Sequence, residues 1–119
     1  MIVIKFSEGR GRGIFATQFI ESNTILFADY SKIMTPEDID LFDKTSLNGH
    51  WFDHPDKKNY GLLPIGYTGL LNHSNDPNAK LKWYETPLGY IGEVVTITNI
   101  QKDKEIFIDY GIKMPNDWI

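Results

Sequence analysis

The sequence predicts a mainly β protein with little helix, that is, a β-rich α+β fold. Short runs of β-branched and aromatic residues recur along the 119 residues, and Gly, Pro, Asn or Asp separates most of them. One segment alone carries a clear helix-start pattern. A chain of this length can bury a modest core without disulfides, so we expect a single domain over residues 1–119, built of several small β-sheets.

The N-terminal part reads as two strands around a glycine-rich loop. Residues 1–6 are the first expected strand, residues 9–13 the loop, and residues 14–16 a second apolar run. After a polar turn at residues 22–23, residues 24–27 again have strand character.

The middle of the chain contains the expected helix. Residues 35–38 read Thr-Pro-Glu-Asp, in which Thr35 can cap the helix, Pro36 suits its first position and two acids lie in its first turn. Residues 46–60 read as loop. Residues 62–71 fit either a strand or a short helix, because glycines interrupt both patterns.

The C-terminal half predicts further strands at residues 81–84, 90–91 and 93–98. The Pro-Leu-Gly sequence at residues 87–89 suits a turn between two of them, and residues 106–110 form the last expected strand.

Two segments far apart in the sequence resemble each other. In residues 17–27 and again in residues 97–107, an isoleucine precedes a polar turn and the following strand ends in phenylalanine. Asn23 and Asp103 occupy matching positions, where a left-handed backbone conformation is tolerated. The pattern favours two similar turns in a domain of small sheets.

Composition excludes several classes of function. The chain has no cysteine, which excludes disulfides, thiolate zinc sites and a cysteine nucleophile. A formal net charge of −4 argues against general nucleic-acid binding. No apolar run approaches the length of a membrane span, and charged residues interrupt the N-terminus at once. We expect a soluble intracellular protein, in the cytoplasm or, for a viral source, in the host nucleus.

Acidic residues are concentrated in the predicted helix, where they could attract a basic peptide. A solvated helix face with acids near its N-terminus is the favoured interpretation. The acids concerned are Glu37, Asp38, Asp40 and Asp43.

Three simpler interpretations of the polar motifs are weak. The glycines at residues 9–13 are spaced G-x-G-x-G and lead into no crossover helix, which disfavours a dinucleotide-binding loop. His50 and His54 could share a helix face and bind a metal, but Pro55 favours a surface loop, and we expect no metal site. His73 has Ser74 and Asp76 nearby, yet sequence neighbours rarely converge into a catalytic triad, so a buried histidine satisfied by backbone is favoured.

Three motifs in order give the chain a specific resemblance. They are residues 11–16 (GRGIFA), residues 66–79 (GYTGLLNHSNDPNA) and residues 105–111 (EIFIDYG). Together they resemble the SET-domain family of protein lysine methyltransferases, especially its minimal viral and bacterial members. The resemblance extends from about residue 2 to residue 110 and reaches toward Trp118.

The resemblance implies a SET-domain fold in which the segment at Asn72 and the C-terminal segment cross in a knot-like arrangement. It implies that Tyr110 is the catalytic tyrosine.

The resemblance also implies the ligands. Residues from the first two motifs would hold S-adenosylmethionine, namely Gly11, Arg12, Gly13, Asn72 and His73. A substrate channel would lie beside Tyr110, with Tyr67, Ile108 and Trp118 as candidate wall residues. Ile108 offers no hydroxyl there and leaves room for more than one methyl group.

The implied activity is methyl transfer from S-adenosylmethionine to a lysine amine in a protein or peptide, with histones among the options. The substrate is expected to be basic, and self-association of the chain stays open. The alternative is a non-catalytic SET-like module that binds a lysine-bearing peptide or the cofactor without turnover.

The sequence departs from the family pattern in two places. The family's upstream active-site tyrosine has no clean match, and Trp51, Phe52 or Tyr60 could take its place. The helix-bearing insert, about residues 32–60, is short, so we expect it to make limited substrate contacts. Residues 112–119 form a short tail.

Overall fold

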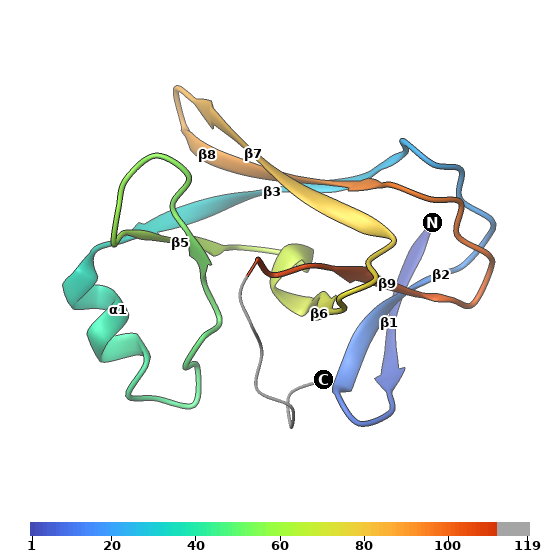
Figure 1. Cartoon of the computed structure of the whole chain (residues 1–119), viewed down its shortest axis with the longest axis horizontal. Helices are drawn as coiled ribbons and strands as arrows, with labels where there is room; N and C mark the ends of the chain where they lie inside the picture. Colours follow the sequence, from blue (N-terminus) through green and yellow to red (C-terminus); the bar gives the residue numbers. More distant parts are fainter. Residues whose placement is uncertain (112–119) are drawn as a thin grey trace.

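The computed structural model describes residues 1–111, and over this range the chain is mainly β. Figure 1 shows a β-hairpin at one end and the helix at the other, with the short strands of residues 72–73 and 105–108 between them. In chain order the elements are β1 (Ile2–Ser7), β2 (Gly11–Ala16), β3 (Ile25–Met34), α1 (Pro36–Phe42), β4 (Phe52–Asp53), β5 (Gly61–Pro64), the 3₁₀ helix η1 (Tyr67–Leu70), β6 (Asn72–His73), β7 (Ala79–Thr86), β8 (Gly89–Thr96) and β9 (Glu105–Ile108).

The strands form two sheets. One has four strands in the order β1-β2-β9-β6, and the other has five in the order β4-β5-β3-β8-β7. All neighbouring strands are antiparallel except β6 and β9, which run parallel, with Asn72 opposite Phe107 and His73 opposite Ile108. This pairing brings the segment of residues 72–78 against the C-terminal strand.

The glycine-rich segment is more regular than predicted. We expected residues 9–13 to be a loop, but β2 begins at Gly11, and Gly11 and Gly13 pair with Ser7 and Lys5 of β1. The expectation was wrong because the flanking strand extends the ladder through these glycines, so only residues 8–10 form the turn.

Strand lengths also differ from the predictions. The strand expected at residues 24–27 continues to Met34, since its second half pairs with β5 while its first half pairs with β8. The ambiguous segment of residues 62–71 contains both alternatives, a strand and then a 3₁₀ helix. The turn predicted at residues 87–89 is confirmed, because Thr86 pairs with Gly89 at the end of the β7–β8 hairpin.

The two similar turns are confirmed. Asn23 and Asp103 both have left-handed backbone, with φ of 64° and 70°. Ile20 and Ile100, three residues before them, exchange both backbone hydrogen bonds at 2.8 Å in an isolated antiparallel bridge. The two segments therefore lie side by side and join the two sheets.

The helix begins as the sequence predicts. The Thr35 side chain accepts a hydrogen bond from the Asp38 backbone N–H at 3.1 Å, and the Asp38 carboxylate accepts one from the Thr35 N–H at 3.0 Å. This reciprocal capping box satisfies two backbone donors that the first turn leaves without helical partners. Asp38 therefore belongs to the cap, and the helix buries none of its residues.

The hydrophobic core is formed by residues from both sheets, including the strand β9 that pairs with β6. Ile14 of β2, Leu71 and Val94 of β8 are fully buried or nearly so, as are Ile106 and Ile108 of β9. Since both core isoleucines of β9 flank Phe107, the strand that carries the C-terminal motif is fixed by its packing. Within residues 1–111, no helix is long and apolar enough to cross a membrane.

Candidate active site

A cleft of about 760 Å³ lies where the two sheets meet. The β1–β2 hairpin, the loop after α1 with β4, the segment from η1 to β6 and Tyr110, two residues after β9, all contribute to it. The lining residues are Gly9, Arg10, Arg12, Thr45, Ser46, Asn48, Gly49, His50, Trp51, Phe52, Asp53, Thr68, Gly69, Leu70, Leu71, Asn72, His73 and Tyr110. Its size is within the range of small-molecule sites, roughly 300–1,000 Å³.

The Asn72 side chain ties three strands together at the cleft wall. Its amide nitrogen donates to the Arg12 carbonyl at 2.8 Å and to the Glu105 carboxylate at 2.7 Å. Asn72 itself belongs to β6, Arg12 to β2 and Glu105 to β9. The amide thus fixes the distance between the glycine hairpin and the central crossing.

His73 is buried and its two ring nitrogens are both engaged. Nδ1 accepts the Tyr110 backbone N–H at 3.0 Å, so it carries no proton, and Nε2 therefore donates to Asn75 Oδ1, which lies 2.9 Å away. Asp109 Oδ1 is 3.8 Å from Nδ1, too far for a hydrogen bond. The prediction of a buried, satisfied histidine is confirmed, and no proton-transfer role is left for the ring.

Residues 74–78, which follow His73 in the same motif, keep this segment aligned with β9. The Asn78 side chain donates to the Glu105 carbonyl at 2.9 Å and accepts from the Phe107 N–H at 2.8 Å, as a strand neighbour would. Ser74 Oγ accepts the Asp76 N–H at 3.0 Å and closes the turn between them. The polar residues of this segment therefore satisfy backbone groups that a crossing without continuous strand pairing leaves free.

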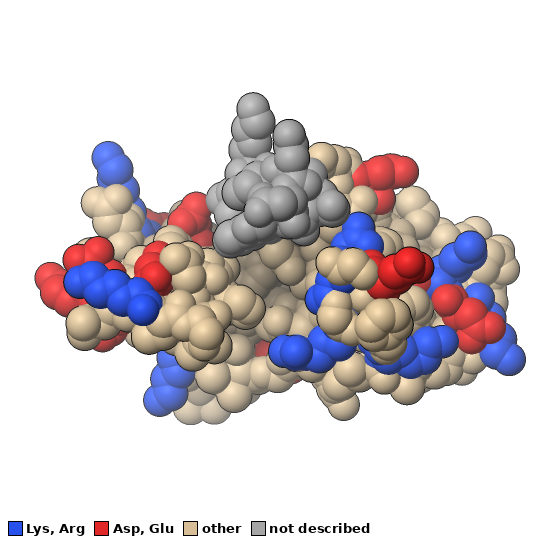
Figure 2. Space-filling model, turned by 90° about the horizontal axis from the view of Figure 1, so that it is seen from below, with Lys and Arg blue, Asp and Glu red and all other residues tan. Residues whose placement is uncertain are grey.

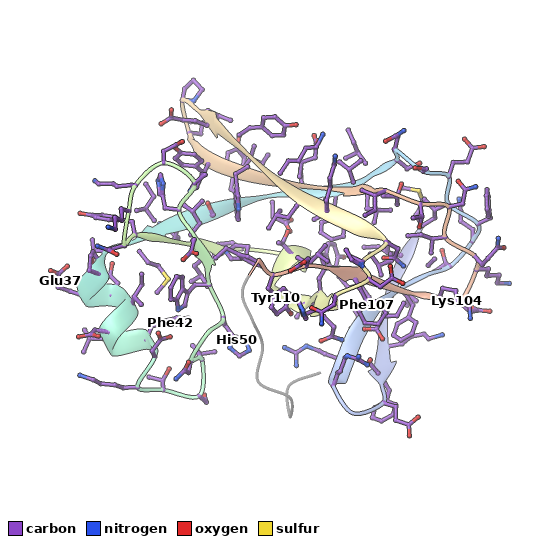
Figure 3. The ribbon with its side chains drawn as sticks, in the orientation of Figure 1. Glu37, Phe42, His50, Lys104, Phe107 and Tyr110 are labelled. Carbon is purple, nitrogen blue, oxygen red and sulfur yellow. The ribbon has the colours of Figure 1, made fainter. Side chains whose placement is uncertain are left out.

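Tyr110 stands at the end of β9, where its ring enters the cleft (Figure 3). Its hydroxyl donates to the Leu71 carbonyl, and its ring is 5.2 Å from the His73 ring, centroid to centroid. Burial, and after it the negative charge of Glu105, raises the pKa of Tyr110 above the ordinary value of 10.0. The phenol therefore keeps its proton at neutral pH and turns a neutral oxygen toward the cleft.

Phe52 faces Tyr110 across the cleft. The two rings are edge to face, with centroids 5.8 Å apart and an interplanar angle of 86°. Of the three residues that could replace the family's upstream tyrosine, Phe52 has the position opposite Tyr110, and it brings no hydroxyl. Trp51 also lines the cleft, whereas Tyr60 lines a second cavity beside α1.

The loop after α1 is organised by Asp43. Its carboxylate oxygen Oδ1 accepts both the Gly49 N–H and the Trp51 indole N–H at 3.0 Å, and its carbonyl accepts the Asn48 side chain at 2.8 Å. The Trp51 ring covers Gly61, whose missing side chain makes room for it: a Cβ there would lie 2.8 Å from the ring. The loop is thus anchored through Asn48, Gly49 and Trp51.

Positive charge marks the hairpin side of the cleft. Arg10 and Arg12 line it, and the Arg10 guanidinium lies 5.2 Å from the centroid of the Phe107 ring, a cation–π contact that holds it against β9. Seen from below, Figure 2 shows several Lys and Arg toward the end where the hairpin lies, with acidic side chains among them, and both signs at the α1 end as well. The hairpin side therefore suits an anionic group such as a carboxylate.

The histidines proposed as an alternative metal site do not form one. Within residues 1–111, no group of three or more His, Asp and Glu side chains could hold a metal ion. His54 Nδ1 accepts the backbone N–H groups of Asp56 and Lys57, at 3.0 and 2.9 Å. His50 lines the cleft instead, from the loop after α1 (Figure 3).

The structure brings Arg12, Asn72, His73 and Tyr110 together at the cleft. Gly11 and Gly13 flank Arg12 in β2 and are not among the lining residues. Their assigned roles in cofactor binding stay predictions.

The channel candidates lie elsewhere. Tyr67 packs its ring against Phe27, with centroids 5.5 Å apart, and Ile108 is fully buried in the core. Neither lines the cleft, so the structure gives them a packing role, and their part in a substrate channel stays a prediction. Trp118 lies outside the described residues.

Sequence reasoning missed most of the loop after α1. This loop and β4 together contribute more lining residues than any other segment, although limited contacts were expected from the short insert. The aromatic pair at Trp51 and Phe52, inside an otherwise polar loop, was the available signal. Arg10 was also missed, and its neighbours Gly9 and Gly11 were the hint, since both have positive φ in the turn that presents it.

Comparison with known proteins agrees with this geometry. The SET-domain family model matches residues 11–111. A solved structure of a Plasmodium falciparum protein, a candidate histone methyltransferase, is 34% identical, with a TM-score of 0.75 and 94% of each chain covered. No curated protein sequence matches at a significant level.

A more distant structure shows the same fold within a larger protein. It is Polycomb Repressive Complex 2 of Chaetomium thermophilum in an autoinhibited conformation bound to S-adenosylmethionine. The identity is 19% and the TM-score 0.77, and the match covers 98% of this chain but only 16% of that one. The family match and the 34% identity together place the chain: it belongs to the SET-domain family, whose fold it shares with histone methyltransferases.

Proposed function

We propose that this protein is an S-adenosylmethionine-dependent methyltransferase that acts on the side-chain amine of a lysine in a protein or peptide. The observation that carries the proposal is the position of Tyr110. Its protonated phenol enters a cleft of suitable size, held by Leu71 and the His73 ring, with Phe52 opposite.

The donor set of the cleft fits the cofactor. Arg10 and Arg12 can bind a carboxylate, the Asn72 amide offers a polar contact, and Trp51 and Leu70 give apolar area for a base. When bound there, S-adenosylmethionine would supply a methyl group on a positively charged sulfur. The residues of this chain bind and orient the two reactants, which accounts for most of the barrier reduction in a displacement of this kind.

The aromatic wall prepares the lysine. Methylation needs the neutral amine, and a lysine side chain that packs against the Phe52 and Tyr110 rings would lose much of its hydration, which lowers the pKa of an ammonium group. The Tyr110 oxygen can stabilise the positive charge passing between the reactants. We assign loss of the amine proton to water.

The substrate we propose is a basic protein segment, histone tails included. The acidic balance of the chain supports this, as does Asp53 on the cleft wall. The test has two arms: calorimetry with S-adenosylmethionine, and methyl transfer onto histones and a lysine peptide array read by mass spectrometry. We expect binding and a mass gain of whole methyl groups on lysine. Binding without transfer would favour the non-catalytic module, and no binding of S-adenosylmethionine would contradict the proposed methyltransferase.

A further inference from the structure

We propose that Glu105 is a positioning residue that holds the cofactor side of the cleft in its binding shape, an inference that rests on the proposed function. Glu105 begins β9 behind the wall formed by Arg12 and Asn72, and it does not line the cleft itself. Its two carboxylate oxygens accept hydrogen bonds from two other strands, Ser7 Oγ at 2.6 Å and Asn72 Nδ2 at 2.7 Å. One side chain thus joins β1, β6 and β9.

The Glu105 carboxylate fixes which way the Asn72 amide points. The amide faces the Arg12 carbonyl and the Glu105 carboxylate, and both of these can only accept hydrogen bonds. The NH₂ group must therefore lie on this side, with both of its hydrogens used. The Asn72 oxygen points away from them, so Glu105 and the Arg12 carbonyl together leave an acceptor, and not a donor, for a ligand.

The contact between Glu105 and Asn72 fills the space that a side chain at Gly13 would occupy. A Cβ on Gly13 would lie 2.3 Å from Glu105 Oε2 and 2.8 Å from Asn72 Nδ2. Its φ is not positive, so the requirement for glycine here is steric. The carboxylate and the amide pack directly onto the hairpin backbone, one residue from the cleft-lining Arg12.

Loss of the carboxylate would leave polar groups without partners. Ser7 is buried, with 3% of its surface exposed, and Asn72 is half-buried. Hydrogen bonds to a charged acceptor are stronger than neutral ones, and groups deprived of them reorient or recruit water. The Asn72 amide would then be held by the Arg12 carbonyl alone, and β1 would lose the hydrogen bond that Ser7 makes to β9.

The experiment compares Glu105→Ala, Gly13→Ala and Glu105→Gln with wild type. Alanine at either position breaks the same contact from opposite sides, so both should weaken S-adenosylmethionine binding by about tenfold or more in calorimetry. Methyl transfer at saturating cofactor should stay within about threefold of wild type, since Tyr110 is not moved. Glutamine can still accept from Asn72 and donate to Ser7, so Glu105→Gln should restore most of the affinity.

Glu85→Ala is the matched control, because Glu85 is exposed on β7, far from the hairpin. It should bind the cofactor as wild type does. Unchanged cofactor affinity in a folded Glu105→Ala or Gly13→Ala variant would overturn the inference, and so would a fall in saturated turnover with affinity intact.

A second readout does not depend on the cofactor. In wild type the Asn72 side-chain NH₂ should exchange slowly with solvent by NMR, because both hydrogens are bonded. In Glu105→Ala this protection should fall clearly, because one of the two hydrogens loses its acceptor, while the backbone spectrum stays dispersed. Retained protection would overturn the positioning role alone, whereas wild-type protein that binds no S-adenosylmethionine would contradict the proposed function and leave this arm to decide the inference.

Discussion

Tyr110 and Tyr90 are the two tyrosines whose environment clearly changes their acidity, and the causes differ. Burial raises the pKa of Tyr110, which keeps a neutral phenol at the cleft. For Tyr90 the main cause is the hydrogen bond that its hydroxyl donates to Asp56, and the pKa rises from 10.0 to about 12. The neutral phenol of Tyr110 is available at the proposed active site. The Tyr90 hydrogen bond attaches the loop of residues 53–60 to β8.

The Tyr90 hydrogen bond predicts a specific loss of stability at high pH. The folded protein holds this proton more tightly than the unfolded chain, so the contribution is complete below about pH 10 and declines as the pH rises toward 12. Tyr90→Phe should therefore lose less stability than wild type between about pH 8 and pH 11 in urea unfolding. Because the pKa of Tyr110 is also raised, the stability of Tyr90→Phe should still fall with pH in this range, but less steeply than that of wild type. Identical pH profiles for the two proteins would contradict the assignment.

At the residue scale, the sequence could indicate the chemistry of the site but not its partners. The polar segment after Leu71 predicted a site because Asn, His and Ser there need partners. Which partners they find depends on the parallel contact with β9, about thirty residues later. His73 is an example. Its sequence neighbours allowed a catalytic triad, and only the hydrogen bond from the Tyr110 N–H to Nδ1 shows that the ring has a structural role.

At the element scale, the loop after α1 and the short strand β4 form one side of the cleft. Asp43 closes the loop by accepting from Gly49 and Trp51. The sequence predicted the helix start well, because capping depends on residues close in sequence. It could not place the loop, since Trp51 is set by Asp43 and by Gly61, ten residues beyond.

Asp43→Ala should loosen this loop without unfolding the protein. The backbone amides of residues 44–51 should exchange faster with solvent, while the global free energy of unfolding falls by no more than about 1–2 kcal/mol. Asp43→Asn keeps the accepting oxygen and should retain much of the protection. Hydrogen exchange read by mass spectrometry distinguishes the two. Equal protection in wild type and Asp43→Ala would contradict the anchoring role.

At the scale of the whole molecule, the crossing of β6 and β9 joins the core to the site. Ile108 is fully buried in the core, and Tyr110 follows two residues later at the cleft. The pattern of short strands predicted a mainly β fold, and this is confirmed. The order of strands within the two sheets could not be predicted from the sequence, because it depends on long-range pairs such as Asn72 with Phe107.

Ile108→Ala tests whether this residue is part of the core. Removing a fully buried isoleucine should lower the free energy of unfolding by about 2–5 kcal/mol, read from urea unfolding. Ile33→Ala is the control, because Ile33 is 53% exposed on β3 and should cost much less. Equal effects at the two positions would show that Ile108 faces solvent or a channel instead.

The most direct test of the central claim is Tyr110→Phe, measured for cofactor binding and for methyl transfer. The variant keeps the ring against Phe52 and removes the hydroxyl that Leu71 holds. We expect S-adenosylmethionine affinity within about threefold of wild type and a turnover lowered by about a hundredfold or more. Tyr84→Phe, at an exposed tyrosine of β7, should leave both unchanged. Wild-type turnover in Tyr110→Phe would contradict the role of this phenol and, with it, the mechanism proposed for the cleft.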